Sequence, residues 1–286
     1  KVPFFIDKMD EYSFGGAETG ETVLITAESG VGKSQALLHF LIQNARVGTD
    51  CALFQIEGTK KQVLDRLDAA WTGSLYHDVK DGNIDQEKQK KLKRILKKIQ
   101  GEIFVEAFEK FGGVTTLDIK NSVKELKKQN PNLKLVCIDY LELMQTSDGI
   151  VYSPKDERFR QKKLGIFCKE LAMEENIVVI APTQASHLAS ELKKDPNFVM
   201  TREYLSEDKG KIRPFDFHYT LNQTYDEQNA IHEITGEDAS RIRIFSDKMR
   251  DYKSGQVFTI VNNFKRSRFY DRKATIDMIM DYEEDE

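Results

Sequence analysis

Residues 27–34 read Ala-Glu-Ser-Gly-Val-Gly-Lys-Ser and directly follow the apolar run 23–26. This pattern is typical of a phosphate-binding loop between a strand and a helix. Backbone N–H groups and the positive end of the following helix supply the donors that a triphosphate needs. The lysine of such a loop reaches the outer phosphates, and the hydroxyl after it binds Mg²⁺. We therefore predict nucleotide binding by Glu28, Ser29, Gly30, Val31, Gly32, Lys33, Ser34 and Gln35.

The composition restricts the partners of the chain. Its 286 residues include 43 lysines and arginines against 47 aspartates and glutamates, a net charge of −4. A contact with a polyanion would therefore have to be local. Three cysteines are too few for a disulfide framework, and Cys51 and Cys137 lie in apolar runs that predict core positions. No apolar stretch could cross a bilayer and no secretory leader is evident, so we expect a cytoplasmic protein without a membrane partner.

Strand-like and helix-like segments alternate, which predicts an α/β fold with a mostly parallel central sheet flanked by helices. Several strand-like segments are continuous apolar runs, as in strands buried on both faces. The last three have no long helix between them, so we expect antiparallel strands at the C-terminal end. The predicted strands are 21–26, 51–56, 103–107, 133–138, 177–181, 216–221, 242–245 and 256–262. The predicted helices are 35–44, 60–70, 86–100, 115–129 and 161–175.

Three polar residues follow predicted strands at the edge of the sheet where the phosphate would lie. Asp139 ends an apolar run and would hold Mg²⁺ together with Ser34. Glu57 follows a neighbouring strand, from which it could orient and deprotonate the attacking water. For Glu57, spacing alone leaves an exposed glutamate in a turn as an equal alternative. Gln184 follows a third strand and could sense the γ-phosphate.

Taken in order, the segments ITAESGVGKS, FQIEG, LVCIDYLEL, VVIAPTQAS and SDKMRDYKSG resemble the motor domain of hexameric replicative DNA helicases of the DnaB type. The resemblance covers nearly the whole chain and implies a RecA-like P-loop NTPase core. It also implies that alanine is tolerated at position 27, the first position of the phosphate loop. Residues 76–100 and 185–212 depart from the family pattern.

The resemblance implies an ATP-dependent helicase that hydrolyses ATP with Mg²⁺ at the subunit interfaces of a homo-oligomeric ring, a hexamer in that family. Lys33, Glu57 and Gln184 would act within one subunit. Lys248 and Arg250 would act on the nucleotide of the adjacent subunit, and such an arginine finger is typically worth ~10³–10⁵ in rate. A solvated hairpin is the alternative for this pair, and the sequence does not decide which of the two is the main finger.

Single-stranded DNA is the partner that the resemblance implies. Its backbone is bound by basic side chains, here on loops that would face the ring centre. The segments 146–163 and 187–211 follow the nucleotide-sensing strands and are the candidates, with solvated surface loops as the alternative. From them we predict DNA contacts by Lys155, Arg158, Arg160, Lys193, Lys194, Lys209 and Lys211.

We divide the chain into a linker or lead-in from a missing N-terminal region (1–20), a motor domain (21–280) and an acidic tail (281–286). A primase or a helicase loader is a candidate partner, in the replisome of a bacterial or phage-infected cell. Two rival functions stay open. One is a RecA-like or KaiC-like ATPase that forms filaments or nucleotide-switched assemblies without unwinding. The other is an ATP-binding scaffold without turnover.

Overall fold

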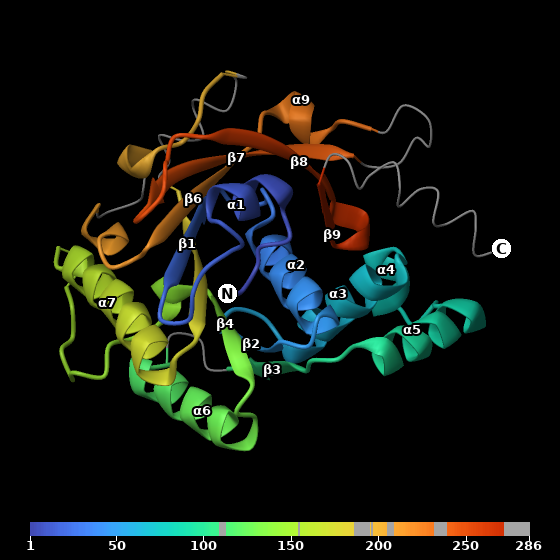
Figure 1. The fold of residues 1–286 in the computed structure, drawn as a ribbon, viewed down its shortest axis with the longest axis horizontal. Helices are drawn as coiled ribbons and strands as arrows, with labels where there is room; N and C mark the ends of the chain where they lie inside the picture. Colours follow the sequence, from blue (N-terminus) through green and yellow to red (C-terminus); the bar gives the residue numbers. More distant parts are fainter. Residues whose placement is uncertain are drawn as a thin grey trace.

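A central mixed sheet organises the fold (Figure 1). The computed structural model describes residues 1–108, 113–153, 155–185, 195, 197–204, 209–231 and 239–271. Within these residues nine strands form one sheet in the order β3-β2-β4-β5-β1-β6-β7-β8-β9. The first six in this order are parallel, and the last three are antiparallel to their neighbours. This confirms the predicted fold class, including the antiparallel C-terminal end.

All eight predicted strands are confirmed with slightly shifted ends, and a ninth, β9, was not predicted. Three strands in the middle of the sheet are buried at nearly every position, because helices cover both of their faces. The strands are β1 (Thr22–Ala27), β2 (Asp50–Gln55), β3 (Ile103–Ala107), β4 (Leu133–Asp139), β5 (Val178–Gln184), β6 (Phe217–Asn222), β7 (Ser240–Met249), β8 (Val257–Asn263) and β9 (Arg268–Asp271).

The five predicted helices are also confirmed. Thr59 and Thr115 begin two of them with capping boxes, in which the threonine side chain and the third helical side chain satisfy each other's backbone N–H groups. These helices are α2 (Lys33–Arg46), α3 (Lys60–Thr72), α5 (Gln86–Lys98), α6 (Thr116–Gln129) and α7 (Glu157–Glu175). Short helices that were not predicted are α1 (Asp7–Tyr12), α4 (Tyr76–Lys80) and α9 (Tyr225–Gln228).

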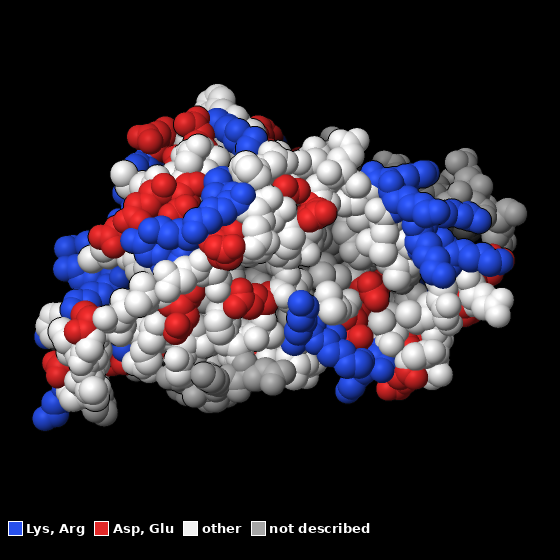
Figure 2. Space-filling model, turned by 90° about the horizontal axis from the view of Figure 1, so that it is seen from below, with Lys and Arg blue, Asp and Glu red and all other residues white. Residues whose placement is uncertain are grey.

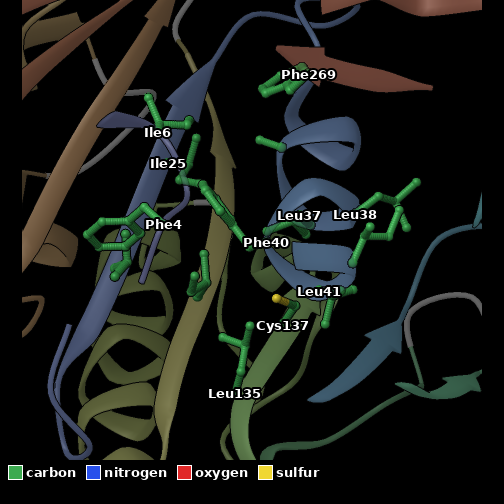
Figure 3. Packing of buried hydrophobic residues seen from close by; sticks show 14 of the residues in the cluster. Phe4, Ile6, Ile25, Leu37, Leu38, Phe40, Leu41, Leu135, Cys137 and Phe269 are labelled. Atoms are coloured by element: carbon green, nitrogen blue, oxygen red, sulfur yellow. The ribbon is translucent and has the colours of Figure 1, made fainter. Parts of the chain in front are cut away.

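Alternate residues of the strands feed two apolar cores, one on each face of the sheet. In β4, Leu135 and Cys137 enter the first core, whereas Val136 and Ile138 enter the second. The first core lies under α2 and α3, and the second under α6 and α7 (Figure 1). Figure 3 shows α2 packed over β1 and β4 in the first core. Cys51 and Cys137 are buried in it, as predicted.

The N-terminal segment packs against the first core. Val2, Phe4 and Ile6 are each at most 2% exposed. The Phe4 ring lies edge-on to Phe40 of α2, with ring centroids 5.9 Å apart, and makes similar contacts with β6. Residues 1–20, predicted as a linker or lead-in, therefore contribute directly to the packing of the motor domain. The proposed boundaries at 20 and 280 stay predictions, and the acidic tail lies outside the described residues.

The stretch 76–100 forms α4 and α5, which pack beside α3. Leu92, Ile95 and Ile99 turn toward the first core. Exposed basic residues, among them Lys93, Arg94 and Lys97, cover the outer side of α5, seen at the right of Figure 2. This agrees with the predicted packing of an amphipathic helix. In the described part of the chain, no helix is both long and apolar enough to cross a membrane.

Candidate nucleotide-binding site

The phosphate loop connects the end of β1 to the start of α2. Gly30 and Gly32 have φ angles of 80° and 111°, a left-handed backbone that favours glycine. A Cβ at Gly32 would also lie 3.1 Å from Nδ2 of Asn262, which leaves little room for a side chain. Gly32 immediately precedes α2, so the unpaired N–H groups at the start of that helix are available to a ligand at the loop. The loop therefore has the backbone geometry that phosphate binding requires.

Ser34 and Asp139 lie side by side at the end of β4. The Ser34 hydroxyl donates to Oδ2 of Asp139 at 2.8 Å, and Gln55 Nε2 donates to the same oxygen at 3.4 Å. Burial raises the pKa of Asp139 above its ordinary value, and the hydrogen bonds from Ser34 and Gln55 oppose this shift. A hydroxyl and a carboxylate are the hard oxygen donors that Mg²⁺ prefers. The two predicted metal ligands are thus adjacent, and their chemistry fits the ion.

The strand order β2-β4-β5-β1 brings the carboxyl ends of four parallel strands into one row. Glu57 follows β2, Asp139 ends β4, Gln184 ends β5, and the phosphate loop follows β1. All of them line a cavity of about 750 Å³. Of the predicted nucleotide-binding residues, those that line it are Ser29, Gly30, Gly32, Lys33, Ser34 and Gln35.

Glu28 and Val31 lie differently from the other residues of the loop. Both line a second, much smaller cavity together with Met200 and Leu221. Val31 is only 2% exposed. If these two residues contact a nucleotide, they would do so through the backbone.

The Lys33 side chain folds back over its own loop. Its ammonium donates to the carbonyl oxygens of Ala27 and Glu28 at 2.8 and 3.0 Å. Burial lowers the pKa of Lys33, while the carboxylates of Glu142 and Asp139 oppose that shift. A phosphate group at the loop would replace two neutral carbonyls with charged acceptors, which bind an ammonium more strongly.

The cavity has a second wall that the sequence analysis missed. Arg66 of α3 lines it, and its guanidinium lies 5.7 Å from the ring centroid of Tyr76. The charge of Arg66 also favours the ionised form of Asp139. A signal was present, because Gln62 and Arg66 are four residues apart and share one face of a helix that follows Glu57. Phe264 and Ser267 complete this wall from the C-terminal strands.

Lys248 and Arg250 lie on the side of the sheet formed by the amino ends of the parallel strands, away from the phosphate loop. β7 runs antiparallel to β6, which pairs Met249 with Phe217 at the amino end of β6. The Arg250 N–H bonds to Asp216 O, and the Asp216 N–H bonds to Thr22 O at the start of β1. The phosphate loop begins five residues later, a strand distance of about 17 Å. Neither side chain therefore belongs to the cavity of its own subunit.

The two predicted fingers differ in how strongly the rest of the chain holds their side chains. The Lys248 ammonium donates to the carbonyl oxygens of Ile212, Arg213 and Phe215. Burial and the charge of Arg250 lower the pKa of Lys248. Arg250 is 47% exposed and pairs with Asp216 at 2.9 Å. Arg250 is therefore better placed to reach another molecule.

The predicted DNA contacts fall into three groups. Lys155 and Arg158 are exposed near the start of α7. Arg160 and Lys211 are buried, at 9% and 3% exposure, so their assignment to DNA was wrong: their charges are already paired inside the protein. Lys193 and Lys194 lie outside the described residues, as does the side chain of Lys209 at the start of η4 (Lys209–Ile212).

The family model for the DnaB-like helicase C-terminal domain matches residues 2–206. The chain is 25% identical over 184 residues to the replicative DNA helicase DnaB of Helicobacter pylori, covering 64% of this chain and 36% of that protein. It is 27% identical over 192 residues to a DnaB-like replicative helicase of Enterobacteria phage T4, covering 66% of this chain and 40% of that protein. The chain thus spans about two fifths of these relatives.

Solved structures share the fold. One of them, the ATPase domain of another protein, superposes with a TM-score of 0.77 at 20% identity, covering 94% of this chain and 90% of that one. A DnaB-like replicative helicase, solved in a study of its interactions with primase, gives the same TM-score and identity, with coverages of 94% and 61%. The fold is therefore that of the RecA-like ATPase domain of DnaB-like helicases.

Proposed function

The chain belongs to the family of DnaB-like helicase C-terminal domains, and on this basis we propose that it is the ATP-hydrolysing motor of a replicative DNA helicase. The observation that carries the proposal is the row of Glu57, Ser34 with Asp139, and Gln184 around one cavity beside a phosphate loop. A cavity of about 750 Å³ has room for a nucleotide. Binding alone would not need a base, a metal site and a polar amide together.

Within one subunit, the phosphate loop and Lys33 would hold the phosphates. Ser34 and Asp139 would hold Mg²⁺, which supplies positive charge next to the phosphate oxygens when it is bound. Glu57 is exposed at the cavity wall and would take a proton from the attacking water. Gln184 would contact the γ-phosphate or that water. Arg66 adds a second cation to the lining of the cavity.

The cation that completes the site comes from a second copy of the chain. Arg250 is half exposed at the edge of the sheet that lies away from its own cavity. A head-to-tail contact between copies would bring it to the next cavity, and repetition of that contact forms a ring if the rotation closes. We propose such a ring, a hexamer by analogy with the family, with Arg250 rather than Lys248 as the main finger.

Single-stranded DNA is the proposed track of this motor. Exposed Lys155 and Arg158 are the described candidates for contact with its backbone, and Lys193, Lys194 and Lys209 stay predictions. A primase or a loader is proposed as a partner because a structural neighbour was solved in a study of interactions with primase. We place this work in the cytoplasm of a bacterial or phage-infected cell, since the relatives described above come from a bacterium and a phage.

The test measures ATP hydrolysis with and without oligo-dT, and strand displacement from a forked duplex. We expect DNA to raise the ATPase rate and the fork to be unwound. DNA coating without displacement would indicate a filament ATPase instead. Nucleotide binding without turnover would indicate a scaffold.

A first variant tests the proposed base. Glu57→Gln removes the proton acceptor and should lower kcat by ~10²–10⁴, with nucleotide affinity unchanged because the phosphate loop is intact. The control is Glu102→Gln, the same change at an exposed glutamate just before β3. Equal rates for the two variants would remove Glu57 from this role.

A further inference from the structure

A buried ion pair lies behind Gln184. Glu142 is part of η1 (Leu141–Leu143), three residues after Asp139. One of its carboxylate oxygens, Oε1, accepts a hydrogen bond from Lys211 Nζ at 2.6 Å and from the Gln184 N–H at 3.3 Å. The Thr183 hydroxyl donates to the same oxygen, and Lys211 also donates to that hydroxyl at 2.9 Å. A single carboxylate oxygen thus joins the end of β4, the end of β5 and η4.

The pair does not line the nucleotide cavity, but Gln184 does. The side chains of Lys211 and Glu142 are 4% and 20% exposed. Burial would raise the pKa of Glu142, but the Lys211 ammonium and the hydrogen bonds outweigh it and hold that pKa below its ordinary value. The carboxylate therefore stays charged behind the wall of the cavity. Buried ion pairs often add little stability compared with apolar residues of similar size, so their placement calls for another explanation.

Two buried cations, Arg160 and Lys211, were suggested by the sequence as DNA-binding residues. In the structure both contact Glu142 instead. Lys211 holds its side chain, and Arg160 donates from Nη2 to its backbone carbonyl at 2.9 Å. Arg160 comes from the first turn of α7, which follows the exposed Lys155. Lys211 lies in η4, which follows the segment after Gln184. Glu142 is therefore fixed from each of the two segments that were predicted to contact DNA.

Close packing limits how η4 can move on its own. A Cβ at Gly165 of α7 would lie 2.7 Å from the Lys211 carbonyl oxygen. The two backbones are therefore in direct contact at this point, which only glycine permits. A displacement of η4 is thus transmitted to α7 as well as to Glu142.

We propose that Glu142 is a positioning residue for Gln184. Lys211 and Arg160, which come from the two segments predicted to contact DNA, would fix the position of Glu142. This rests on the proposed function. A shift of either segment moves the carboxylate, and the Gln184 backbone, which donates to it, moves with it. The ion pair would thus couple contact with the DNA strand to the position of the Gln184 side-chain amide at the γ-phosphate.

The test replaces the pair without leaving a buried charge. Glu142→Met combined with Lys211→Met fills the same space with apolar atoms, so the fold should persist. We expect the DNA-stimulated kcat to fall about 10–100-fold, as for a misplaced catalytic group, while KM for ATP and nucleotide affinity change less than about twofold. The control is Glu227→Gln, which removes the carboxylate charge from the comparable Arg243–Glu227 pair on β7 and α9, with side chains 11% and 19% exposed. It should keep wild-type stimulation.

A second readout needs no turnover. The Gln184 backbone N–H donates to Glu142, and methionine at that position offers no comparable acceptor. Hydrogen exchange at this N–H should therefore be faster in the Glu142→Met, Lys211→Met double variant than in wild type, and unchanged in Glu227→Gln. Normal DNA stimulation in the folded double variant, or unchanged exchange at Gln184, would overturn the inference. A wild-type protein without ATPase activity would instead overturn the proposed function, which keeps the two failures distinct.

Discussion

Basic side chains in this protein differ in role according to their burial. Lys33 and Lys211 are enclosed and hold carbonyl or carboxylate oxygens of their own chain. Lys248 is half-buried and bound to three carbonyl oxygens. Arg250 keeps about half of its side chain in solvent. Of these four, Arg250 is the residue exposed enough to reach a second copy of the chain, whereas Lys33 would act on a nucleotide held in its own cavity.

A buried histidine joins three strands next to the site. His218 Nε2 lies 2.8 Å from the Thr26 hydroxyl, and Nδ1 lies 2.8 Å from Oδ2 of Asp247. Arg202 pairs with the same aspartate at 3.0 Å. Burial lowers the pKa of His218 below its ordinary 6.5, although Asp247 opposes this shift and Arg202 and Lys248 add to it. The histidine is therefore neutral at neutral pH.

This gives a pH dependence with a definite sign. Below pH 6.5 the unfolded chain protonates His218 before the folded chain does, so the unfolded state binds more protons. The free energy of unfolding should fall as the pH drops from 7.5 to 5.5, by up to ~1.4 kcal/mol per pH unit from this residue. Urea denaturation of wild type and His218→Asn would measure the difference in slope. His77→Asn, at an exposed histidine, should keep the wild-type slope, and an equally steep slope in His218→Asn would contradict the assignment.

Sequence alone could place the residues whose chemistry is tied to a motif. Ser34, Glu57 and Asp139 follow strands or a glycine-rich turn, and the parallel sheet brings such positions to one edge. Arg160 and Lys211 were misassigned because a basic residue gives no sequence signal of its own burial. Arg160 pairs with Glu157, and Lys211 pairs with Glu142, which is distant from it in sequence, so only the folded chain brings that second pair together.

The C-terminal strands supply hydrogen-bond donors to the end of α3. Arg268 donates from Nε to the carbonyl oxygen of Ala70 at 2.6 Å and from Nη2 to that of Trp71 at 3.3 Å, and Arg266 donates to that of Gly73. α3 has no basic residue in its own last turn. The two arginines therefore satisfy the free carbonyls at its negative end. The same segment supplies Phe264 and Ser267 to the cavity.

Removing one of these arginines tests the element. Arg268→Met should lower the free energy of unfolding by about 1–2 kcal/mol, because buried carbonyls lose charged donors. It should also weaken nucleotide binding, since Phe264 and Ser267 would lose their fixed position. Denaturant unfolding and nucleotide titration measure the two effects. Arg46→Met, at an exposed arginine in the last turn of α2, should change neither, and equal losses in both variants would contradict this role.

The long elements were predictable from periodicity, and the short ones were not. Strands such as β4 and helices such as α6 carry continuous or periodic apolar patterns. β9 has four residues, two of them charged, and among the described strands it pairs only with β8, so it has no pattern of its own. The role of residues 1–20 was also hidden, because Val2, Phe4 and Ile6 become core residues only when α2 and β6 meet.

In the whole molecule, the nucleotide cavity lies at the carboxyl ends of the parallel strands, and Arg250 lies at the amino end of β6 in the same continuous sheet. If Arg250 completes the site, that site requires two copies of the chain, and a ring requires that the contact be head-to-tail. This arrangement was implied by the family resemblance and could not be derived from spacing, since both positions follow ordinary strand-like segments.

A mixture of two inactive proteins tests the shared site. Glu57→Gln removes the proposed base from the cavity but keeps Arg250. Arg250→Ala keeps the cavity intact but removes the finger. Assembled together in equal amounts, they form junctions in which an intact cavity faces an intact finger. We expect ATPase activity of about a quarter of the wild-type rate if junctions form at random and act independently. Activity no higher than that of either protein alone would show that Arg250 does not act across the junction.

The separation of cavity and finger also distinguishes two ways of sharing a site. Two copies related by a twofold axis would exchange fingers only with each other, and the assembly would close at two. A ring uses the other arrangement, in which each copy gives its finger to one neighbour and receives one from the next, so that every member of this array faces the same way around the axis. Sites that fire in succession along such an array have a built-in sense of rotation, and a strand held at its centre could be drawn in only one direction.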